Sequence, residues 1–423
     1  MKVLVVGGGG REHALCWKLA QSPRVTELVC APGNAGIAQV ARCVQVPAKD
    51  ISGIVALAKA ERADFVVVAP DDPLAMGCVD RLQEAGIPAF GPTQSAARME
   101  SSKIFAKSLM QKYNIPTAKY AIFTECDAAL TYIDTQRTPV VVKADGLALG
   151  KGVVVAQTRE EARAAVRDMM RDGRFGEAGA KVLIEECMTG PEVTLLCLVD
   201  GQTIVPMLSS QDHKRALEGD QGLNTGGMGT IAPCPLYTPE IAERVEREIL
   251  LPTLAALHAE GIVFRGVLYV GLMLTPAGPR VVEYNARFGD PETQVLLPLL
   301  DSDLLEAMLA CSEGRLSPQH LRWRTDSAAC VVLASGGYPG PYEKDKPISG
   351  LEEAARRGGL VFHAGTRQEK DAVLTAGGRV LGVTAVADTL HAALAAAYTA
   401  ADAIAFEGLH RRNDIGRAAL ADA

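Results

Sequence analysis

The 423-residue sequence has no long uninterrupted hydrophobic segment and no excess of positive charge. A membrane helix needs about 20 consecutive apolar residues, which no stretch approaches, and Arg11 and Glu12 interrupt the apolar start too early for a signal peptide. The 43 basic residues are outnumbered by 50 acidic ones, for a formal net charge of -7, which argues against a broad nucleic-acid-binding face. We therefore expect a cytoplasmic protein that acts on small molecules, with no nucleic-acid or membrane partner.

The sequence also lacks any Cys-x-x-Cys pair, although it contains ten cysteines. The spacing of the first five fits no metal-ligand pattern: Cys16, Cys30, Cys43, Cys78 and Cys126. We expect these cysteines to be small hydrophobic residues in a reducing compartment.

The dinucleotide-binding fingerprint lacks its third glycine. The stretch KVLVVGGGGREHALCWKLA predicts a strand, a tight turn and a helix, with Gly7 and Gly9 in place but Glu12 at the third glycine position. The second strand ends at Ala31, where an NAD site would carry an acidic residue. A nicotinamide-dependent oxidoreductase is therefore disfavoured. The helix N-terminus and Arg11 still suit a phosphate, and the alternative is a glycine turn needed only for chain geometry.

Strand and helix patterns divide the chain into four units. They alternate over the first hundred residues, which predicts an open parallel sheet. Helical stretches are expected near Asp72–Ala85, after FGPT up to Tyr113, and near Pro239–Ala259. The predicted fold class is α/β and α+β multidomain, with units at residues 1–101, 102–190, 191–325 and 326–423.

A glycine-rich loop lies in VVVKADGLALGKGVVVA, between two apolar strands. Gly146, Gly150 and Gly152 allow a backbone to approach oxyanions closely, and Lys143 and Lys151 flank them. The spacing does not match the Gly-x-x-x-x-Gly-Lys-Ser/Thr pattern, which excludes a P-loop. The alternative is a flexible surface hairpin.

The strand in RVVEYNARFGDPETQ carries polar side chains on one face. Glu283, Asn285 and Arg287 are spaced two residues apart and therefore point to the same side. A carboxylate beside an amide oxygen suits a hard cation such as Mg²⁺, and the arginine suits a carboxylate or phosphate. The alternative is an ordinary polar sheet face.

Mixed charges precede a second glycine-rich loop in SSQDHKRALEGDQGLNTGGMG. Asp212, His213, Lys214 and Arg215 are adjacent, and the loop covers residues 224–229. This combination suits a substrate with both an amine and an anion, although a solvated loop with incidental charges is the alternative. His213 has no Ser or Cys nucleophile beside it, so it does not by itself indicate a general base.

Taken together, these segments resemble a known superfamily. KADGLALGKGV, IEECMTGPEVT and the Glu283/Asn285 strand are similar to the ordered parts of ATP-grasp enzymes. GGGGREHAL, APGNAG, QDHKR, NTGGMG, RFGDPETQ, ASGGYPG and RRNDIG narrow the resemblance to the phosphoribosylamine–glycine ligase (glycinamide ribonucleotide synthetase) family, from Val3 to Gly416. The implied fold is an ATP-grasp fold, preceded by a half-Rossmann-like domain and followed by a small C-terminal α/β domain.

This resemblance implies ATP-dependent ligation of glycine to 5-phosphoribosylamine in purine biosynthesis, giving glycinamide ribonucleotide, ADP and phosphate. ATP is implied to phosphorylate the glycine carboxylate, after which the ribosylamine nitrogen displaces phosphate from glycyl phosphate. Because an acyl phosphate hydrolyses in water, a loop must close over it. A monomer that uses ATP and Mg²⁺ or Mn²⁺ is also implied.

The resemblance also assigns roles to individual residues. Glu283 and Asn285 are the implied metal ligands, while Asp212, Lys214 and Arg287 are implied to orient glycine and the transferred phosphoryl group. Contacts to ATP are implied for Lys103, Lys143, Gly146, Gly150, Lys151, Gly152, Glu185, Glu186, Met188 and Glu192. Contacts to the other substrates, including the ribose phosphate at the N-terminal turn, are implied for Gly9, Gly10, Arg11, Glu12, Gly33, Asn34, Asn224, Thr225, Gly226, Gly227, Met228 and Pro291.

A few positions depart from the family pattern. Many ATP-grasp enzymes carry a further carboxylate on the strand at Leu268–Leu274, where only Tyr269 is polar here, so a second metal would have to rely on Glu283. Another ATP-grasp ligase or carboxylase of nucleotide metabolism remains the nearest rival, but it would lack NTGGMG beside RFGDPE. A non-catalytic nucleotide sensor could have lost Glu283 or Asn285, and both are present.

Overall fold

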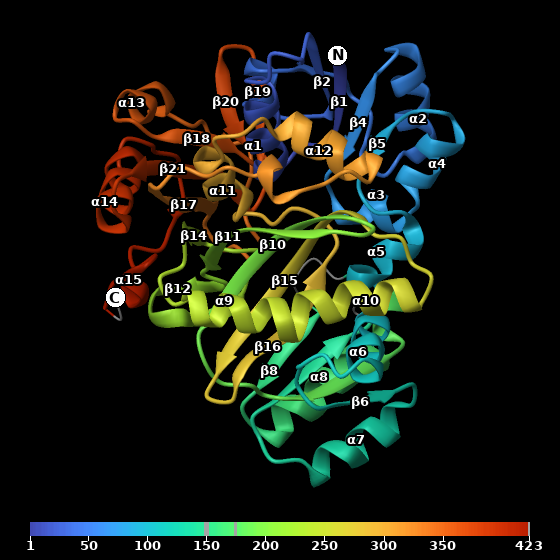
Figure 1. Cartoon of the computed structure of the whole chain (residues 1–423). Helices are drawn as coiled ribbons and strands as arrows, with labels where there is room; N and C mark the ends of the chain where they lie inside the picture. Colours follow the sequence, from blue (N-terminus) through green and yellow to red (C-terminus); the bar gives the residue numbers. More distant parts are fainter. Residues whose placement is uncertain (148–151, 173–175, 422–423) are drawn as a thin grey trace.

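Three sheets of four or more strands, with the helices around them, build the molecule (Figure 1). The computed structural model describes residues 1–147, 152–172 and 176–421. The N-terminal sheet is parallel, as the sequence predicts, and its strands lie in the order β3-β2-β1-β4-β5. Its strands are β1 (Lys2–Gly7), β2 (Glu27–Pro32), β3 (Arg42–Cys43), β4 (Phe65–Val68) and β5 (Ala89–Phe90).

Helices cover both faces of this parallel sheet, which is why its strands are almost entirely apolar. Val3 and Val5 of β1 pack with α1 (Gly10–Leu19), whereas Leu4 and Val6 pack with α2 (Ile51–Ala60) and α4 (Cys78–Glu84). The glycine-rich turn therefore leads from a buried strand directly into α1.

Two of the predicted helical stretches are each divided into two helices. Asp72–Ala85 divides into α3 (Asp71–Ala75) and α4, because Gly77 between them has a φ of 80°. The helix up to Tyr113 divides into α5 (Gln94–Ser101) and α6 (Lys103–Lys112). Ser102 separates them with an extended backbone, and its Oγ accepts a hydrogen bond of 3.1 Å from the backbone N–H of Phe105.

The next unit is an antiparallel sheet of order β6-β9-β7-β8. Leu130, Ile133 and Val166 of its two helices pack with the apolar strand residues to form a separate small core. The elements are β6 (Tyr120–Phe123), α7 (Cys126–Thr135), β7 (Val140–Ala144), β8 (Val153–Ala156), α8 (Arg159–Met170) and β9 (Val182–Glu186).

The largest sheet runs in the order β16-β15-β10-β11-β14-β17-β21-β18, with β22 also paired to β17. Because β14 pairs with β17, the predicted division at residue 325 falls within one continuous sheet. The strands are β10 (Glu192–Asp200), β11 (Ile204–Asp212), β14 (Gly229–Ala232), β15 (Arg265–Thr275), β16 (Gly278–Asn285), β17 (Ser327–Ser335), β18 (Leu360–His363), β21 (Arg379–Ala387) and β22 (Leu409–His410).

Helices pack on this sheet along its whole length. The predicted helix Pro239–Ala259 is present as α9 (Pro239–Val245), a π-helical turn (Glu246–Leu250) and α10 (Leu251–Ala259), and it crosses the sheet in Figure 1. Pro252 lacks the N–H that regular helical pairing requires, which accounts for the wider turn. The other helices are α11 (Thr293–Leu299), α12 (Leu304–Glu313), α13 (Leu351–Arg356), α14 (Leu390–Ala401) and α15 (Arg417–Ala421).

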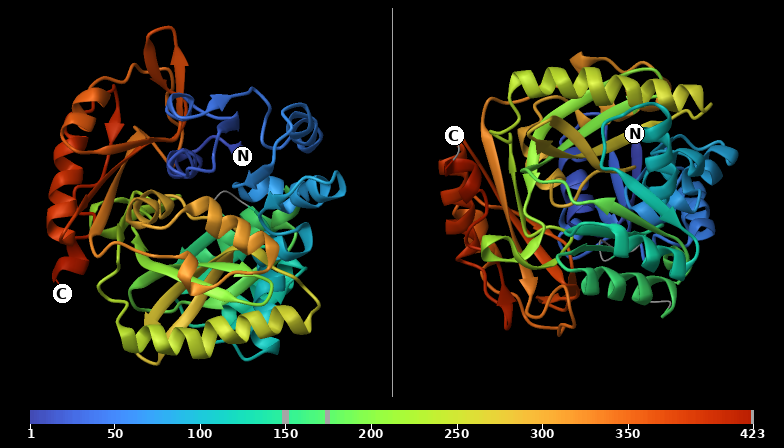
Figure 2. Two further views of the ribbon diagram at one scale, coloured as in Figure 1. Left: turned by 45° about the horizontal axis from the view of Figure 1, so that its top comes forward. Right: turned by 90° about the horizontal axis from the view of Figure 1, so that it is seen from below.

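The N-terminal unit also packs against the C-terminal strands, as the left view of Figure 2 shows. The backbone N–H of His363 on β18 donates a 2.8 Å hydrogen bond to Nδ1 of His13 on α1. The amide of Asn34 donates to the carbonyls of Gly8 at 2.9 Å and His363 at 2.7 Å. Two short hairpins complete the structure, β12 (Arg215–Leu217) with β13 (Gln221–Asn224) and β19 (Thr366–Glu369) with β20 (Ala372–Thr375).

Within the described residues, no helix is long and apolar enough to cross a membrane. All ten cysteines are free, and most are buried, in agreement with the role expected from their spacing.

Candidate active site

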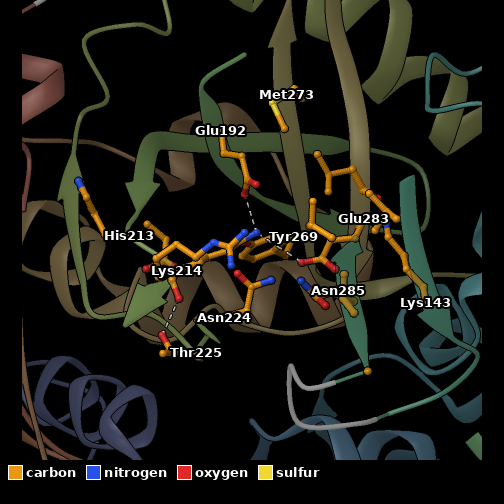
Figure 3. Close-up of a pocket in the computed structure, with 18 of the residues that line it drawn as sticks. Lys143, Glu192, His213, Lys214, Asn224, Thr225, Tyr269, Met273, Glu283 and Asn285 are labelled. Atoms are coloured by element: carbon orange, nitrogen blue, oxygen red, sulfur yellow. Dashed lines mark hydrogen bonds and ion pairs between the residues drawn. The ribbon is translucent and has the colours of Figure 1, made fainter. Parts of the chain in front are cut away.

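A cavity of about 1360 Å³ lies where the four-stranded sheet faces the largest sheet, and it extends to the C-terminal strands. Typical small-molecule pockets measure about 300–1,000 Å³, so this cavity has room for a nucleotide and further substrates. α6, β7, β10, β11, β16 and β21 all contribute to its wall. In Figure 3 the side chains of Lys214, Asn224, Glu283 and Asn285 point toward a common centre.

Buried lysines line one end of the cavity. Lys143 on β7 and Lys107 on α6 lie 3.0 Å and 3.1 Å from the same carboxylate oxygen of Glu185. Lys103, at the start of α6, donates a 2.7 Å hydrogen bond to the carbonyl of Gly146. Burial lowers the pKa of Lys103 and lowers that of Lys107 to about 8. Poorly solvated cations of this kind favour a polyanionic ligand such as a triphosphate.

The end of β9 carries a free hydrogen-bond acceptor. Glu185 is only 3% exposed, and its Oε1 is buried without a hydrogen-bond partner. Glu186 and Met188 follow it along the cavity wall, and Glu186 is held 3.1 Å from Arg280. An unpartnered buried acceptor needs an explanation, and an N–H donor of a bound base would supply one.

Lys214 connects two carboxylates across the centre of the cavity (Figure 3). Its Nζ lies 2.7 Å from Glu192 on β10 and 3.7 Å from Glu283 on β16. Burial lowers the pKa of Lys214, but Glu192, Tyr269 and Glu283 outweigh it and raise that pKa well above its ordinary value. The lysine is therefore fully charged at neutral pH.

Glu283 and Asn285 lie on the same face of β16, as the sequence predicts, and both line the cavity. Burial raises the pKa of Glu283, but surrounding cations, with Lys214 the strongest, hold it below its ordinary value. Among the described residues, the side chain of Asn285 makes no hydrogen bond, and no group of three or more His, Cys, Asp and Glu forms a metal cage. Two oxygen donors beside a phosphate site fit Mg²⁺, which keeps waters and phosphate oxygens as its other ligands.

Arg287 continues this face and is held by a residue that the sequence analysis missed. Its guanidinium lies 2.9 Å from Glu100 on α5, which is 8% exposed and also accepts a 2.8 Å hydrogen bond from the N–H of Ala286. Nε of Arg287 is buried without a partner. The arginine is thus positioned from one side and has a donor left for a ligand.

The NTGGMG loop packs closely on the cavity wall. Gly227 has a φ of 116°, and a Cβ at this position would lie 2.5 Å from Oδ1 of Asp212 and 2.4 Å from Cδ of Pro291. Arg379, which the sequence analysis did not single out, donates hydrogen bonds to the carbonyls of Gly226 at 2.6 Å and Asp290 at 2.7 Å. The loop and the RFGDPE segment are therefore fixed to each other and to β21.

His213 is a structural residue in this arrangement. Its Nδ1 lies 3.2 Å from the carbonyl of Gly229, and its Nε2 accepts a 3.0 Å hydrogen bond from the N–H of Gly416. Burial lowers the pKa of His213. Both ring nitrogens are therefore engaged by backbone groups in this arrangement.

In the N-terminal turn, carboxylates of the protein contact the donors that a phosphate would use. Glu12 accepts a 2.6 Å hydrogen bond from the N–H of Gly9 and lies 2.6 Å from Nε of Arg11. Asp290 accepts a 3.2 Å hydrogen bond from the N–H of Arg11. Because carboxylates of the protein itself occupy these donors, an incoming phosphate would have to displace them.

Of the predicted site residues, the following line the cavity: Arg11, Lys103, Lys143, Gly146, Gly152, Glu185, Glu186, Met188, Glu192, Asp212, Lys214, Asn224, Thr225, Gly226, Glu283, Asn285 and Arg287. Gly150 and Lys151 lie outside the described residues. The following do not line it: Gly9, Gly10, Glu12, Gly33, Asn34, Gly227, Met228 and Pro291. The side chain of Met228 is fully buried in the C-terminal hydrophobic core, so only its backbone is available to a ligand.

Three family models match successive parts of the chain. They are the N domain, the ATP-grasp (A) domain and the C domain of phosphoribosylglycinamide synthetase, at residues 1–100, 101–293 and 328–418. A phosphoribosylamine–glycine ligase from Nostoc sp. is 53% identical over 98% of this chain and 99% of its own length. One from Allochromatium vinosum is 50% identical over 100% of this chain and 99% of its own length.

Solved structures agree with this match. The crystal structure of a phosphoribosylamine–glycine ligase from Thermotoga maritima has a TM-score of 0.85 and 34% identity, covering 98% of this chain and 100% of that one. The biotin carboxylase domain of a Hydrogenobacter thermophilus 2-oxoglutarate carboxylase has a TM-score of 0.73 at 17% identity, covering 96% of this chain and 91% of that one. The second likeness shows the shared fold alone.

Proposed function

This chain belongs to the phosphoribosylglycinamide synthetase family, and we propose how its site catalyses the family's reaction. It is an ATP-dependent ligase of purine biosynthesis that joins glycine to 5-phosphoribosylamine, giving glycinamide ribonucleotide, ADP and phosphate. The observation that carries the site assignment is the convergence of Lys103, Lys143, Glu283 and Asn285 on one cavity that also reaches the NTGGMG loop.

ATP binding is assigned to the end of the cavity between the two sheets. Lys103 and Lys143 neutralise its phosphates, and the free Oε1 of Glu185 accepts a hydrogen bond from the base. Glu192 accepts hydrogen bonds from the ribose hydroxyls. Lys214 orients the carboxylate of Glu192 for this role, since its Nζ lies 2.7 Å from that carboxylate. Gly146 and Gly152 line the cavity, and their backbone is assigned to the phosphates of ATP; Gly150 and Lys151 lie outside the described residues.

Glu283 and Asn285 would hold the divalent ion that ATP-grasp enzymes use, and we assign Mg²⁺ or Mn²⁺ to this position. When bound, this ion supplies Lewis-acid polarisation and a template for the phosphates. The low pKa of Glu283 keeps its carboxylate ionised and ready to bind a cation.

The chemistry requires an activated carboxylate, because oxide is too poor a leaving group for direct attack by an amine. A glycine carboxylate oxygen attacks the terminal phosphorus of ATP, which releases ADP and gives glycyl phosphate. The amine nitrogen of phosphoribosylamine then attacks the acyl carbon, the C–O bond to phosphate breaks, and the amine loses a proton. Lys214 and Arg287 stabilise the charge on the transferred phosphoryl group, so catalysis depends on positioning and electrostatics.

The third substrate enters beside the NTGGMG loop and the C-terminal unit. Arg11, Asn224, Thr225 and Gly226 line this part of the cavity. The ribose phosphate is assigned to Arg11 and to the turn at Gly9 and Gly10. Gly33 and Asn34 pack against this turn and shape it. The bound phosphate displaces Asp290 from the start of α1. We expect a monomer in the cytoplasm, where ten free cysteines remain reduced.

The experiment that tests this function follows ADP release with Mg²⁺, ATP, glycine and freshly generated phosphoribosylamine. ADP should form only when both co-substrates are present, together with one glycinamide ribonucleotide per ADP. ADP formation that does not depend on glycine or on phosphoribosylamine would reject the assignment.

A further inference from the structure

The carboxylate of Asp145 binds the first turn of α6 beside the cavity. Asp145 follows β7 directly, and its Oδ1 accepts a 3.1 Å hydrogen bond from the backbone N–H of Ile104 and another of 3.1 Å from the hydroxyl of Ser102. Its own N–H donates a 3.0 Å hydrogen bond to the carbonyl of Lys181, next to β9. One carboxylate therefore connects the start of α6 to the four-stranded sheet.

These hydrogen bonds complete the N-terminal cap of α6. The first N–H groups of a helix have no partner within the helix. Here Oγ of Ser102 accepts the N–H of Phe105 at 3.1 Å, and Asp145 accepts that of Ile104. A negative charge at this end also interacts favourably with the helix dipole. The carboxylate thus fixes the first turn of α6, and Lys103 is the first residue of that turn.

The side chain of Lys103 contacts the same segment a second time. Its Nζ donates a 2.7 Å hydrogen bond to the carbonyl of Gly146, the residue after Asp145. Gly146 has a φ of 129°, and a Cβ there would lie 2.8 Å from Cβ of Ala178, so only glycine brings the backbone this close. Within the described residues the ammonium makes no other hydrogen bond or ion pair. Because an ammonium has three N–H donors, two of them are left for a ligand.

The contact joins two units that pack separately. α6 packs through Ala106 and Leu109 in the core of the largest sheet, whereas Val142 of β7 packs in the core of the four-stranded sheet. Asp145 itself does not line the cavity, but Lys103 and Gly146 do. An effect of Asp145 on a ligand must therefore act through these two residues.

We propose that Asp145 is a positioning residue for nucleotide binding, whose carboxylate fixes the first turn of α6 so that Lys103 presents its free donors to the phosphates of ATP in one orientation. The inference rests on the proposed function for the contact between Lys103 and ATP.

The physical basis is the conformational freedom of the lysine. A lysine side chain loses much rotamer freedom when it is held in one geometry, and this loss opposes binding. Asp145 fixes the backbone of Lys103 before the nucleotide arrives, and the carbonyl of Gly146 holds the ammonium near the cavity. Less freedom is then lost when the phosphates bind. Without the carboxylate, the first turn of α6 would lose a cap, and Lys103 would have no fixed starting position.

The test measures binding of adenylyl imidodiphosphate, a non-hydrolysable ATP analogue, to the full chain with Mg²⁺ by isothermal titration calorimetry. Asp145→Ala should raise the dissociation constant about fivefold, the factor that corresponds to the typical loss of a helix cap. Asp145→Asn keeps Oδ1 as an acceptor for both donors and should bind the analogue nearly as the parent does.

Asp50→Ala is the matched control, because it also removes a capping carboxylate. Asp50 caps α2, where it accepts a 2.9 Å hydrogen bond from the N–H of Gly53, and α2 does not line the cavity. This variant should bind the analogue as the parent does. A loss of affinity equal to that of Asp145→Ala would show a general effect of stability and would overturn the inference.

A double-mutant cycle with Lys103→Met separates positioning of this lysine from a structural role. In the Lys103→Met background, Asp145→Ala should weaken binding little further, because the group through which it acts is gone. Equal effects of Asp145→Ala with and without Lys103 would overturn the inference, as would unchanged affinity in Asp145→Ala. If Asp145→Ala fails to fold, Ser102→Ala, which removes one of the two donors, replaces it in the cycle.

The binding cycle needs neither glycine nor phosphoribosylamine, so its result is independent of the complete reaction. If the cycle behaves as expected but ADP formation does not depend on the co-substrates, the proposed function fails and the role of Asp145 in nucleotide binding stands. A parent protein that binds no nucleotide would overturn both.

Discussion

Nζ of Lys214 lies between the carboxylates of Glu192 and Glu283, at 2.7 Å and 3.7 Å. In the proposed assignment one of these carboxylates contacts the ribose of ATP and the other holds the metal ion. A single lysine therefore sets the distance between the two nucleotide-binding groups, and it also lies where the transferred phosphoryl group carries its charge.

Lys214→Met should reduce kcat about 100-fold or more, because loss of one positioned transition-state donor typically has an effect of that size. It should also raise the KM for ATP, since Glu192 and Glu283 then repel each other. Initial rates of ADP formation at saturating glycine would show this. Lys344→Met, at an exposed position, is the control, and equal kcat in both variants would contradict the role of Lys214.

Glu283→Gln should abolish ligation while leaving the fold intact. The substitution removes the charged metal ligand but changes neither the size of the side chain nor the core around β16. Metal binding can be measured by Mn²⁺ electron paramagnetic resonance in the presence of ADP, and the fold by thermal unfolding. A variant with near-normal turnover and full Mn²⁺ affinity would show that the metal binds elsewhere.

Glu100→Ala should destabilise the protein and impair catalysis together. It leaves Arg287 as a buried charge without a partner, which costs about 3–5 kcal/mol in the free energy of unfolding. Urea denaturation measures this loss. The double variant Glu100→Ala/Arg287→Met should recover part of the stability but none of the activity, and full recovery of activity would remove Arg287 from the mechanism.

His13 should make the protein sensitive to acid. Burial, with a smaller contribution from His363, lowers the pKa of His13 to about 3, whereas an unfolded histidine has a pKa of about 6.5. Between these values the unfolded state binds more protons, so stability is fully present above pH 6.5 and falls as the pH drops toward 3.

Thermal unfolding between pH 7 and 4 tests this link between α1 and β18. His13→Asn keeps a hydrogen-bond acceptor near the N–H of His363 but does not titrate, so its stability should fall less steeply with pH. His391→Asn, at an exposed position of α14, should behave as the parent does. Parallel curves for all three proteins would exclude His13 as the cause.

The sequence predicted that Glu283 and Asn285 share one face, because side chains two residues apart on a strand point to the same side. Arg287 lies two residues beyond the end of β16 and also lines the cavity. The sequence also predicted the open parallel N-terminal sheet from alternating elements. It missed Glu100, because the residues up to Tyr113 form one helical pattern in which the break at Ser102 is not visible. At that break Oγ of Ser102 donates a 3.1 Å hydrogen bond to Asp145.

Other errors have tertiary causes. Glu292 was inside the recognised RFGDPE motif, but only the approach of Thr194 shows that a hydroxyl donates to its buried carboxylate. Asp290 accepts a hydrogen bond from Arg11 in the N-terminal turn, although the two residues are 279 positions apart. No local sequence pattern contains such a contact. Arg379 likewise reaches the site only because β17 and β21 extend the same sheet.

The central claim is that the glycine carboxylate is activated by phosphoryl transfer from ATP. Its most direct test uses glycine labelled with ¹⁸O in both carboxylate oxygens, together with ATP, Mg²⁺ and phosphoribosylamine, and reads the isotope shift of the product phosphate by ³¹P NMR. If glycyl phosphate forms, each phosphate released carries one ¹⁸O atom, and glycinamide ribonucleotide retains the other. Product phosphate without ¹⁸O, at full formation of glycinamide ribonucleotide, would contradict the account.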